Sequence, residues 1–186
     1  MFLDNCLRYF RWKKAINLVK KFPQKSVICD IGSGSKGDFL RKTSSFVNKG
    51  FGFDKNAEIY YDAKIELKKL DLEKDIIPLE EETVDIVTML AVVEHLEKPG
   101  HILKEIFRIL KPDGFLILTT PSLRAKPILN FLATIKLIHQ KDILEHKKYY
   151  SLKELESLLL RSGFQKEDMS FKYFELGFNI LVIAKK

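Results

Sequence analysis

The chain has 186 residues, of which 46% are hydrophobic and 31% are charged, and its formal net charge is +7. This length allows one domain with a hydrophobic core, and the composition excludes a disordered chain. No apolar run reaches the ~18 residues of a membrane-spanning helix, and the two cysteines, Cys6 and Cys29, exclude a disulfide framework and favour a reducing cytoplasmic location.

The first 25 residues hold most of the excess positive charge. They contain seven Lys or Arg residues and one acid, Asp4, whereas the rest of the chain is nearly neutral. The segment predicts a helix with an apolar face formed by Tyr9, Trp12, Ala15, Ile16 and Val19. The opposite, basic face indicates either the solvated side of a docked helix or weak attraction to an anionic membrane surface.

Strands and helices alternate in the remainder of the chain. Strands are expected at 26–31, 50–54, 65–72, 84–90 and 115–120, and helices at 38–47, weakly at 56–63, and at 99–110, 126–138 and 151–163. This alternation predicts a parallel α/β sheet in one domain that spans residues 1–186. Two final strands, 168–175 and 178–184, are joined by so short a link that they must form an antiparallel hairpin.

A glycine-rich loop follows the first predicted strand, in the stretch "ICDIGSGSKGDF" at 28–39. Strand, glycine turn and helix form the arrangement that binds the polar end of a nucleotide at a helix N-terminus. Gly32, Gly34 and Gly37 satisfy the G-x-G-x-x-G dinucleotide pattern, but Asp30 stands two residues before the first glycine. From these residues alone, three alternatives stay open: a nicotinamide dinucleotide, another adenosine-containing ligand, or no ligand.

Five blocks of sequence together resemble the class I S-adenosylmethionine-dependent methyltransferases, in their small-molecule branch. The blocks are "VICDIGSGS", "GFGFDKN", "LDLEKDIIPLEEETVDIVTMLAVVEHLEKP", "EIFRILKPDGFLILTTP" and "EHKKYYSLKELESLLLRSGF". They follow the order of the family and cover roughly residues 26–184 with the closing hairpin. The resemblance implies a Rossmann-like sheet of seven strands in the order 3-2-1-4-5-7-6, with helices on both faces. One departure is Lys36, which occupies the place of the family's third glycine and leaves the shape of the loop open.

The resemblance also implies the cofactor, S-adenosylmethionine, and the residues that bind it. Gly32 and Gly34 would let the loop approach the amino-acid end of the cofactor, and Asp30 would hold its ammonium group directly or through water. Asp54 would accept hydrogen bonds from the two ribose hydroxyls. The remaining expected contacts are Asp71 with the adenine amino group, the Leu72 backbone with the ring, and Leu90 and Ala91 with the methionine portion. A strand-end aspartate can alternatively act only as a cap or turn residue.

Two histidines are candidate catalytic residues. His95 follows Glu94 just past the fourth strand, at the expected mouth of the site, and His146 lies shortly before a helix capped by Ser151. An unperturbed histidine titrates near pH 6.5 and can act as a base. His95 could equally orient its loop, and His146 could be a packing residue. No cluster of acids indicates a metal site, so we expect none.

The reaction predicted from the sequence is methyl transfer to a small-molecule, lipid or glycan-type acceptor, with oxygen as the favoured atom. The stretch "MLAVVEH" lacks the Asn/Asp-Pro-Pro-aromatic motif of amino-group methyltransferases, and neither cysteine is placed as the nucleophile of a cytosine methyltransferase. The alternatives are a nicotinamide oxidoreductase and a non-catalytic binding module. Nucleic-acid binding is a weaker prediction because no aromatic stacking surface is visible in the sequence.

Substrate specificity is expected from segment 121–150, which follows the fifth strand. Its helix 126–138 carries apolar residues on most sides. As a lid, this segment would line the acceptor pocket with Ile128, Phe131, Leu132 and Ile135; as a plain core helix, it would not touch substrate.

Overall fold

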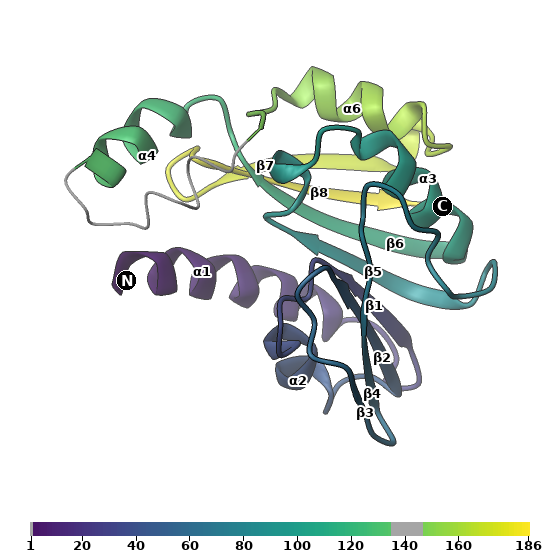
Figure 1. Cartoon of the computed structure of the whole chain (residues 1–186). Helices are drawn as coiled ribbons and strands as arrows, with labels where there is room; N and C mark the ends of the chain where they lie inside the picture. Colours follow the sequence, from purple (N-terminus) through teal and green to yellow (C-terminus); the bar gives the residue numbers. More distant parts are fainter. Residues whose placement is uncertain (1, 135–146) are drawn as a thin grey trace.

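The structure is a computed structural model that describes residues 2–134 and 147–186. One sheet runs through the molecule, and helices cover both of its faces (Figure 1). The helices are α1 (Phe2–Val19), α2 (Asp38–Thr43), α3 (Pro99–Ile109), α4 (Ala125–Thr134) and α6 (Leu152–Leu160), with short 3₁₀ helices η1 (Val93–His95) and η2 (Lys166–Asp168). The strands are β1 (Val27–Ile31), β2 (Lys49–Asp54), β3 (Tyr60–Tyr61), β4 (Ile65–Lys69), β5 (Val84–Leu90), β6 (Leu110–Pro121), β7 (Met169–Phe174) and β8 (Asn179–Lys185).

The strands form an eight-stranded sheet in the order β3-β4-β2-β1-β5-β6-β8-β7. β4, β2, β1, β5 and β6 are mutually parallel, whereas β8 pairs antiparallel with both β6 and β7. The predicted Rossmann-like sheet and its closing hairpin are therefore confirmed. The seven expected strands also keep their expected order, and the eighth strand is β3, which was not predicted.

The edge strand β3 corrects the weak helix that the sequence predicts over 56–63. Tyr60 and Tyr61 pair antiparallel with Leu67 and Glu66 of β4. Two adjacent aromatic residues fit a half-buried edge of a sheet better than a short helix, since aromatic side chains favour the pleated surface. Asp62 closes the turn by accepting hydrogen bonds from the backbone N–H groups of Lys64 and Ile65, both at 2.7 Å.

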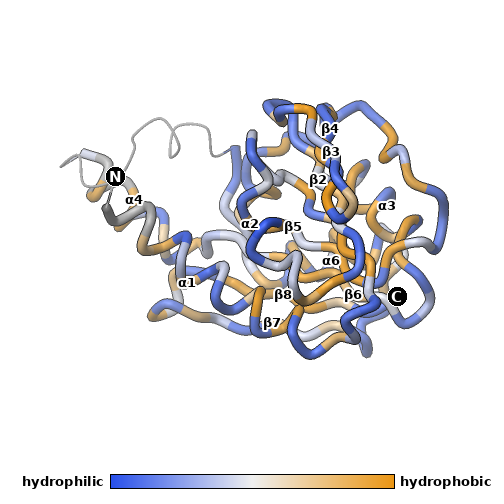
Figure 2. The backbone as a smooth tube through the Cα atoms, turned by 90° about the horizontal axis from the view of Figure 1, so that it is seen from below, coloured by the Kyte–Doolittle hydropathy of each residue, from blue (hydrophilic) through white to orange (hydrophobic). Residues whose placement is uncertain are grey.

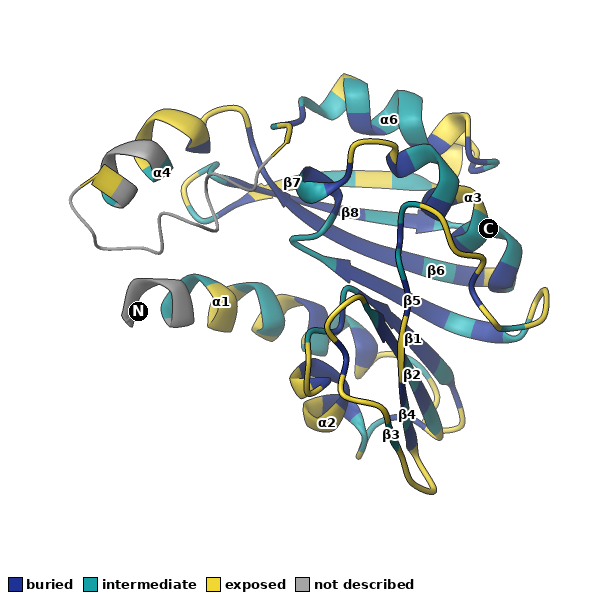
Figure 3. Ribbon diagram, in the orientation of Figure 1, coloured by how far each residue is buried: buried dark blue, intermediate teal, exposed yellow. Residues whose placement is uncertain are grey.

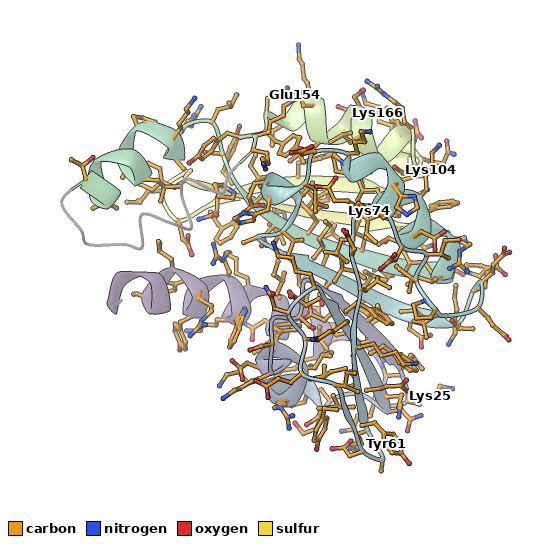
Figure 4. The ribbon with its side chains drawn as sticks, viewed as in Figure 1. Lys25, Tyr61, Lys74, Lys104, Glu154 and Lys166 are labelled. Atoms are coloured by element: carbon orange, nitrogen blue, oxygen red, sulfur yellow. The ribbon has the colours of Figure 1, made fainter. Side chains whose placement is uncertain are left out.

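Two apolar layers hold the helices against the sheet. One layer joins the sheet to α3 and α6, and the other joins it to α1 and α2. The buried residues lie along the central strands in Figure 3, and the apolar stretches of Figure 2 follow the same strands. The predicted cap of α6 is present as a capping box, in which Ser151 and Glu154 (labelled in Figure 4) bond each other's backbone N–H groups.

Helix α1 docks on the sheet through its second half. Ala15 and Val19 are fully buried, and Trp12 meets Phe39 of α2 edge to face at 6.0 Å between ring centroids. Tyr9, which the sequence places on the same face, is 58% exposed. The first half of α1 extends past the edge of the sheet in Figure 1, so periodicity alone overestimates the length of the docked face.

Candidate active site

A cleft of about 1300 Å³ opens at the carboxyl ends of the parallel strands. Its floor is formed by residues that follow β1, β2, β4, β5 and β6, and its side walls come from α1 and α4. This edge, where connections diverge to the two faces of the sheet, is where open α/β folds bind ligands. Of the eight predicted cofactor-binding residues, six line this cleft: Gly32, Asp54, Asp71, Leu72, Leu90 and Ala91.

The glycine loop requires glycine at its first and last positions. Gly32 has φ +76°, and a Cβ atom there would lie 2.2 Å from Cγ2 of Val92. Gly37, at φ +60°, is the N-cap residue of α2, and a Cβ there would lie 2.6 Å from a methyl group of Leu67. The G-x-G-x-x-G spacing is therefore built into the fold, and Lys36 is an exposed residue before the cap whose carbonyl accepts a hydrogen bond from Arg41 Nε at 2.8 Å.

Asp54 connects this loop to the end of β2. Its Oδ2 accepts a hydrogen bond from the backbone N–H of Gly34 at 3.0 Å, and its Oδ1 accepts from that of Asn56 at 2.7 Å. The carboxylate is half-buried and lines the cleft. Each carboxylate oxygen retains capacity for a further donor, because a carboxylate offers about four lone-pair sites. Gly34 itself does not line the cleft.

Asp71 and Leu72 follow β4 on the same side of the cleft. Asp71 accepts a hydrogen bond from the Glu73 backbone N–H at 3.0 Å and pairs with Lys74 at 3.2 Å. The pKa of Asp71 is lowered, chiefly by the hydrogen bond from the Glu73 N–H and to a smaller extent by the Lys74 ammonium. Leu72 is buried in the core and also borders the cleft, which gives this wall an apolar surface.

Asp30 lies beneath the loop and does not line the cleft. It is buried, and the hydroxyl of Thr88 donates a hydrogen bond to its Oδ1 at 2.6 Å. Burial raises the pKa of Asp30 to about 7; the Thr88 hydrogen bond opposes the rise, and the nearby Asp54 charge adds to it. In this geometry Asp30 supports the strand ends below the loop.

The end of β5 brings Leu90, Ala91 and His95 to the cleft. Ala91 has φ +58°, an uncommon backbone conformation for a residue other than glycine, and its N–H donates to the Thr119 carbonyl at 2.9 Å. His95 is half-buried at the mouth. The second candidate base, His146, lies outside the described residues.

Glu94 is a cleft residue that the sequence placed only at the mouth of the site. Its side chain is fully buried, and the hydroxyl of Thr120 donates to its Oε2 at 2.9 Å. Its carbonyl accepts the backbone N–H groups of Lys147 at 2.8 Å and Lys148 at 3.2 Å. Burial raises the pKa of Glu94, while His95 and Arg11 oppose the rise. No sequence pattern indicated that this carboxyl group would be enclosed.

The two side walls differ in chemistry. Ala125, Ile128, Leu129 and Leu132 of α4 line the cleft, while the Phe131 side chain and Ile135 lie outside the described residues. The opposite wall includes Leu7 and Arg11 of α1. This wall was not predicted from the sequence, although the i, i+4 spacing places both residues on one helix face.

These residues fit the ligand implied by the sequence resemblance. Gly32 and Val92 form a cradle that a Cβ atom would fill, so the chain can pass close to a bound molecule here. Asp54 supplies a carboxylate suited to a ribose diol, and Leu72 supplies an apolar surface suited to an adenine ring. The carboxylate acceptor and the apolar wall therefore match an adenosine with a polar tail.

Three comparisons place the chain among known proteins. Residues 7–168 match the model of a family described as "Methyltransferase domain". A relative from Candida albicans, "Ubiquinone biosynthesis O-methyltransferase, mitochondrial", is 32% identical over 105 residues, which are 50% of this chain and 32% of the relative. The match thus spans about a third of the length of that protein.

Solved structures share the fold. A SAM-dependent methyltransferase from Archaeoglobus fulgidus superposes with a TM-score of 0.71 at 20% identity, covering 96% of this chain and 94% of that one. The trans-methyltransferase CalH, solved with SAH, gives a TM-score of 0.66 at 20% identity, covering 92% of this chain and 54% of that one.

Proposed function

This chain belongs to the methyltransferase domain family, and on that premise we propose that it transfers the methyl group of S-adenosylmethionine to a hydroxyl oxygen of a small, largely apolar acceptor. The family match confirms the resemblance found in the sequence, and S-adenosylmethionine is the cofactor that it implies. A nicotinamide oxidoreductase is not favoured.

We propose the following arrangement for the cofactor. The glycine loop accommodates its amino-acid end, and the buried Asp30 carboxyl group interacts with the ammonium group through water. Asp54 accepts hydrogen bonds from the ribose hydroxyls. Asp71 and Leu72 border the adenine, while Leu90 and Ala91 border the methionine portion. S-adenosylmethionine supplies an already activated methyl group, so the protein must chiefly align the acceptor and exclude water.

The single observation that carries the acceptor proposal is the apolar wall of α4 beside the strand ends. Ile128, Leu129 and Leu132 border the same cleft as His95. A hydrophobic acceptor would bury its body against α4 and direct its hydroxyl toward the strand ends. Oxygen is favoured because the relative from Candida albicans is named as an O-methyltransferase. His95, which lines the same cleft, would lie beside the acceptor hydroxyl.

Two further proposals concern the surroundings of the protein. Helix α1 exposes Lys13 and Lys14 together with the aromatic side chains of Tyr9 and Phe10, and the turn that follows it exposes Lys20 and Lys21. This combination is suited to weak contact with an anionic lipid surface. No helix within the described residues is long and apolar enough to cross a membrane. Cys6 and Cys29 are free thiols, which supports a reducing, cytoplasmic location.

The experiment compares two amphiphilic probes, 4-hexylphenol and 4-hexylaniline, with isotope-labelled S-adenosylmethionine. We expect formation of S-adenosylhomocysteine and labelled 4-hexylanisole, detected by mass spectrometry, at a rate above the acceptor-free background. Transfer to the aniline nitrogen alone would contradict oxygen as the target. Binding of S-adenosylhomocysteine with transfer to neither probe would contradict the acceptor class and leave the cofactor assignment intact.

A further inference from the structure

Two residues that line the cleft carry buried oxygen atoms without hydrogen-bond partners. Within the described residues, four buried side-chain oxygens have no hydrogen-bond partner: Glu94 Oε1, Thr119 Oγ1, Glu175 Oε1 and Asn179 Oδ1. Glu94 and Asn179 belong to the lining of the cleft. No side-chain nitrogen of the described residues is buried and unpaired in this way. The unmet demand of the cleft is therefore for hydrogen-bond donors.

The Glu94 side chain is held so that one oxygen is left over. Its Oε2 takes the Thr120 hydroxyl at 2.9 Å, and its backbone carbonyl is fixed by the N–H groups of Lys147 and Lys148. With η1 anchored in this way and the side chain 0% exposed, Oε1 makes no hydrogen bond to the described residues. Such an oxygen is unfavourable unless a ligand supplies a donor.

Asn179 repeats this feature on the other side of β6. It pairs with Pro121, whereas Thr120, which holds Glu94, pairs with Ile180. Because side chains alternate along a strand, Thr120 and Asn179 project from opposite faces of the sheet. The Asn179 amide donates to the Glu175 carboxylate and leaves Oδ1 unpaired. Unpaired oxygens thus flank the end of β6 on both faces.

Charged and titratable groups reach Glu94 from three directions. Arg11 acts from α1 and His95 from η1, and both favour the carboxylate. Tyr149 and Tyr150 precede α6, and each has a raised pKa, chiefly because of burial and also because of the negative charge of Glu94. In its ionised form, Glu94 only accepts hydrogen bonds, and the group that completes that form brings an O–H or N–H.

We propose that Glu94 Oε1 accepts a hydrogen bond from a donor group on the methyl acceptor. Glu94 would thereby select acceptors that carry a hydroxyl or amine at the position facing Oε1 over those that carry a ketone, ether or carboxylate there. This inference rests on the proposed function. The ammonium group of the cofactor is a second possible source of the donor, but the glycine loop, Asp54 and Asp71 serve the cofactor from the β1, β2 and β4 side of the cleft. Glu94 lies beyond β5, toward β6, after which helix α4 follows.

The experiment uses a matched pair of probes, 4-hexylphenol and 4-hexylanisole, in which the donor O–H of the first is replaced by O–CH3 in the second. Their affinities are measured by calorimetry for the full chain, with and without S-adenosylhomocysteine. The test variant is Glu94→Met with Thr120→Val, because replacing both partners leaves no new unpaired group. The control is Thr119→Val, which removes an unpaired buried oxygen outside the cleft lining.

We expect the parent and the control to bind the phenol at least about tenfold more tightly than the anisole, and the double variant to bind both equally. The double variant should keep its affinity for S-adenosylhomocysteine and a Tm at least equal to that of the parent. A parent that does not distinguish the probes overturns the inference. A double variant that loses S-adenosylhomocysteine affinity tenfold also overturns it, because the donor would then belong to the cofactor. A double variant whose Tm falls by more than about 4 °C overturns it as well, because Glu94 would then have a structural role. Failure of S-adenosylhomocysteine to bind the parent contradicts instead the proposed function.

Discussion

Replacement of Asp54 by alanine tests the assignment of the ribose subsite. The half-buried carboxylate at the end of β2 borders the cleft and holds the backbone N–H groups of Gly34 and Asn56. A hydrogen bond to a charged group contributes about 1.5–3 kcal/mol, so the loss of two such bonds to the ribose would weaken binding by roughly 3–6 kcal/mol if they were additive. Water and the remaining contacts will compensate for part of this loss, and we therefore expect at least a tenfold loss of affinity, which is about 1.4 kcal/mol.

Calorimetric titration with S-adenosylhomocysteine measures this effect, with circular dichroism to verify the fold. The matched control is Asp62→Ala, since Asp62 also accepts two backbone N–H groups but lies in the β3–β4 turn, away from the cleft lining. The control should lose stability without losing affinity. An Asp54→Ala protein whose Kd stays within about threefold of the parent would refute the reasoning, because 3 kcal/mol corresponds to more than a hundredfold.

Further predictions concern the loop, the buried acid, the lid and the basic helix. Gly32→Ala should lower Tm and S-adenosylhomocysteine affinity together, because its Cβ would collide with Val92, whereas Gly100→Ala, with open space around it, should be neutral or stabilising. Because the pKa of Asp30 in the folded state is raised to about 7, its contribution to stability is complete below about pH 3.8 and is lost as the pH rises through about 7. The Tm of Asp30→Asn should therefore rise relative to that of the parent across this range. A difference in Tm that does not change with pH would contradict the assignment. Leu132→Asp should slow methyl transfer to 4-hexylphenol while leaving S-adenosylhomocysteine affinity unchanged, and equal rates would exclude α4 from the acceptor wall. Charge reversal at Lys13, Lys14, Lys20 and Lys21 should abolish salt-sensitive binding to anionic vesicles with little change in Tm, because each lysine near the surface contributes about 1 kcal/mol to binding. A parent protein that does not bind such vesicles at low salt would contradict the membrane proposal.

The order of the sheet was implied by the family resemblance, whereas the position of the carboxylates at its edge could be predicted from the strand pattern. Parallel strands all end at the same edge, so acids placed directly after predicted strands must converge. Asp54 and Asp71 follow this rule and reach the cleft. Asp30 follows it too, but it faces Thr88 on the neighbouring strand, a contact set by the pairing of β1 with β5 and not by local sequence.

Features that depend on tertiary packing could not be predicted. The wall formed by Leu7 and Arg11 arises because α1 extends beyond the sheet, and helical periodicity does not encode where a docked face stops. Glu94 was visible in the sequence, but its enclosure depends on Thr120 and on the segment at 147–148, which is distant along the chain. Lys36 was interpreted as a departure from the family loop, and only the backbone shows that Gly37 takes the left-handed cap position instead.

The most direct test of the central claim is a thermal-shift and calorimetric comparison of S-adenosylhomocysteine with NAD on the unmodified chain. S-adenosylhomocysteine at a hundredfold excess over its Kd should stabilise the fold by about 2.7 kcal/mol, which corresponds to a Tm rise of roughly 5–10 °C. NAD should leave Tm unchanged. Stabilisation by NAD without stabilisation by S-adenosylhomocysteine would contradict the account.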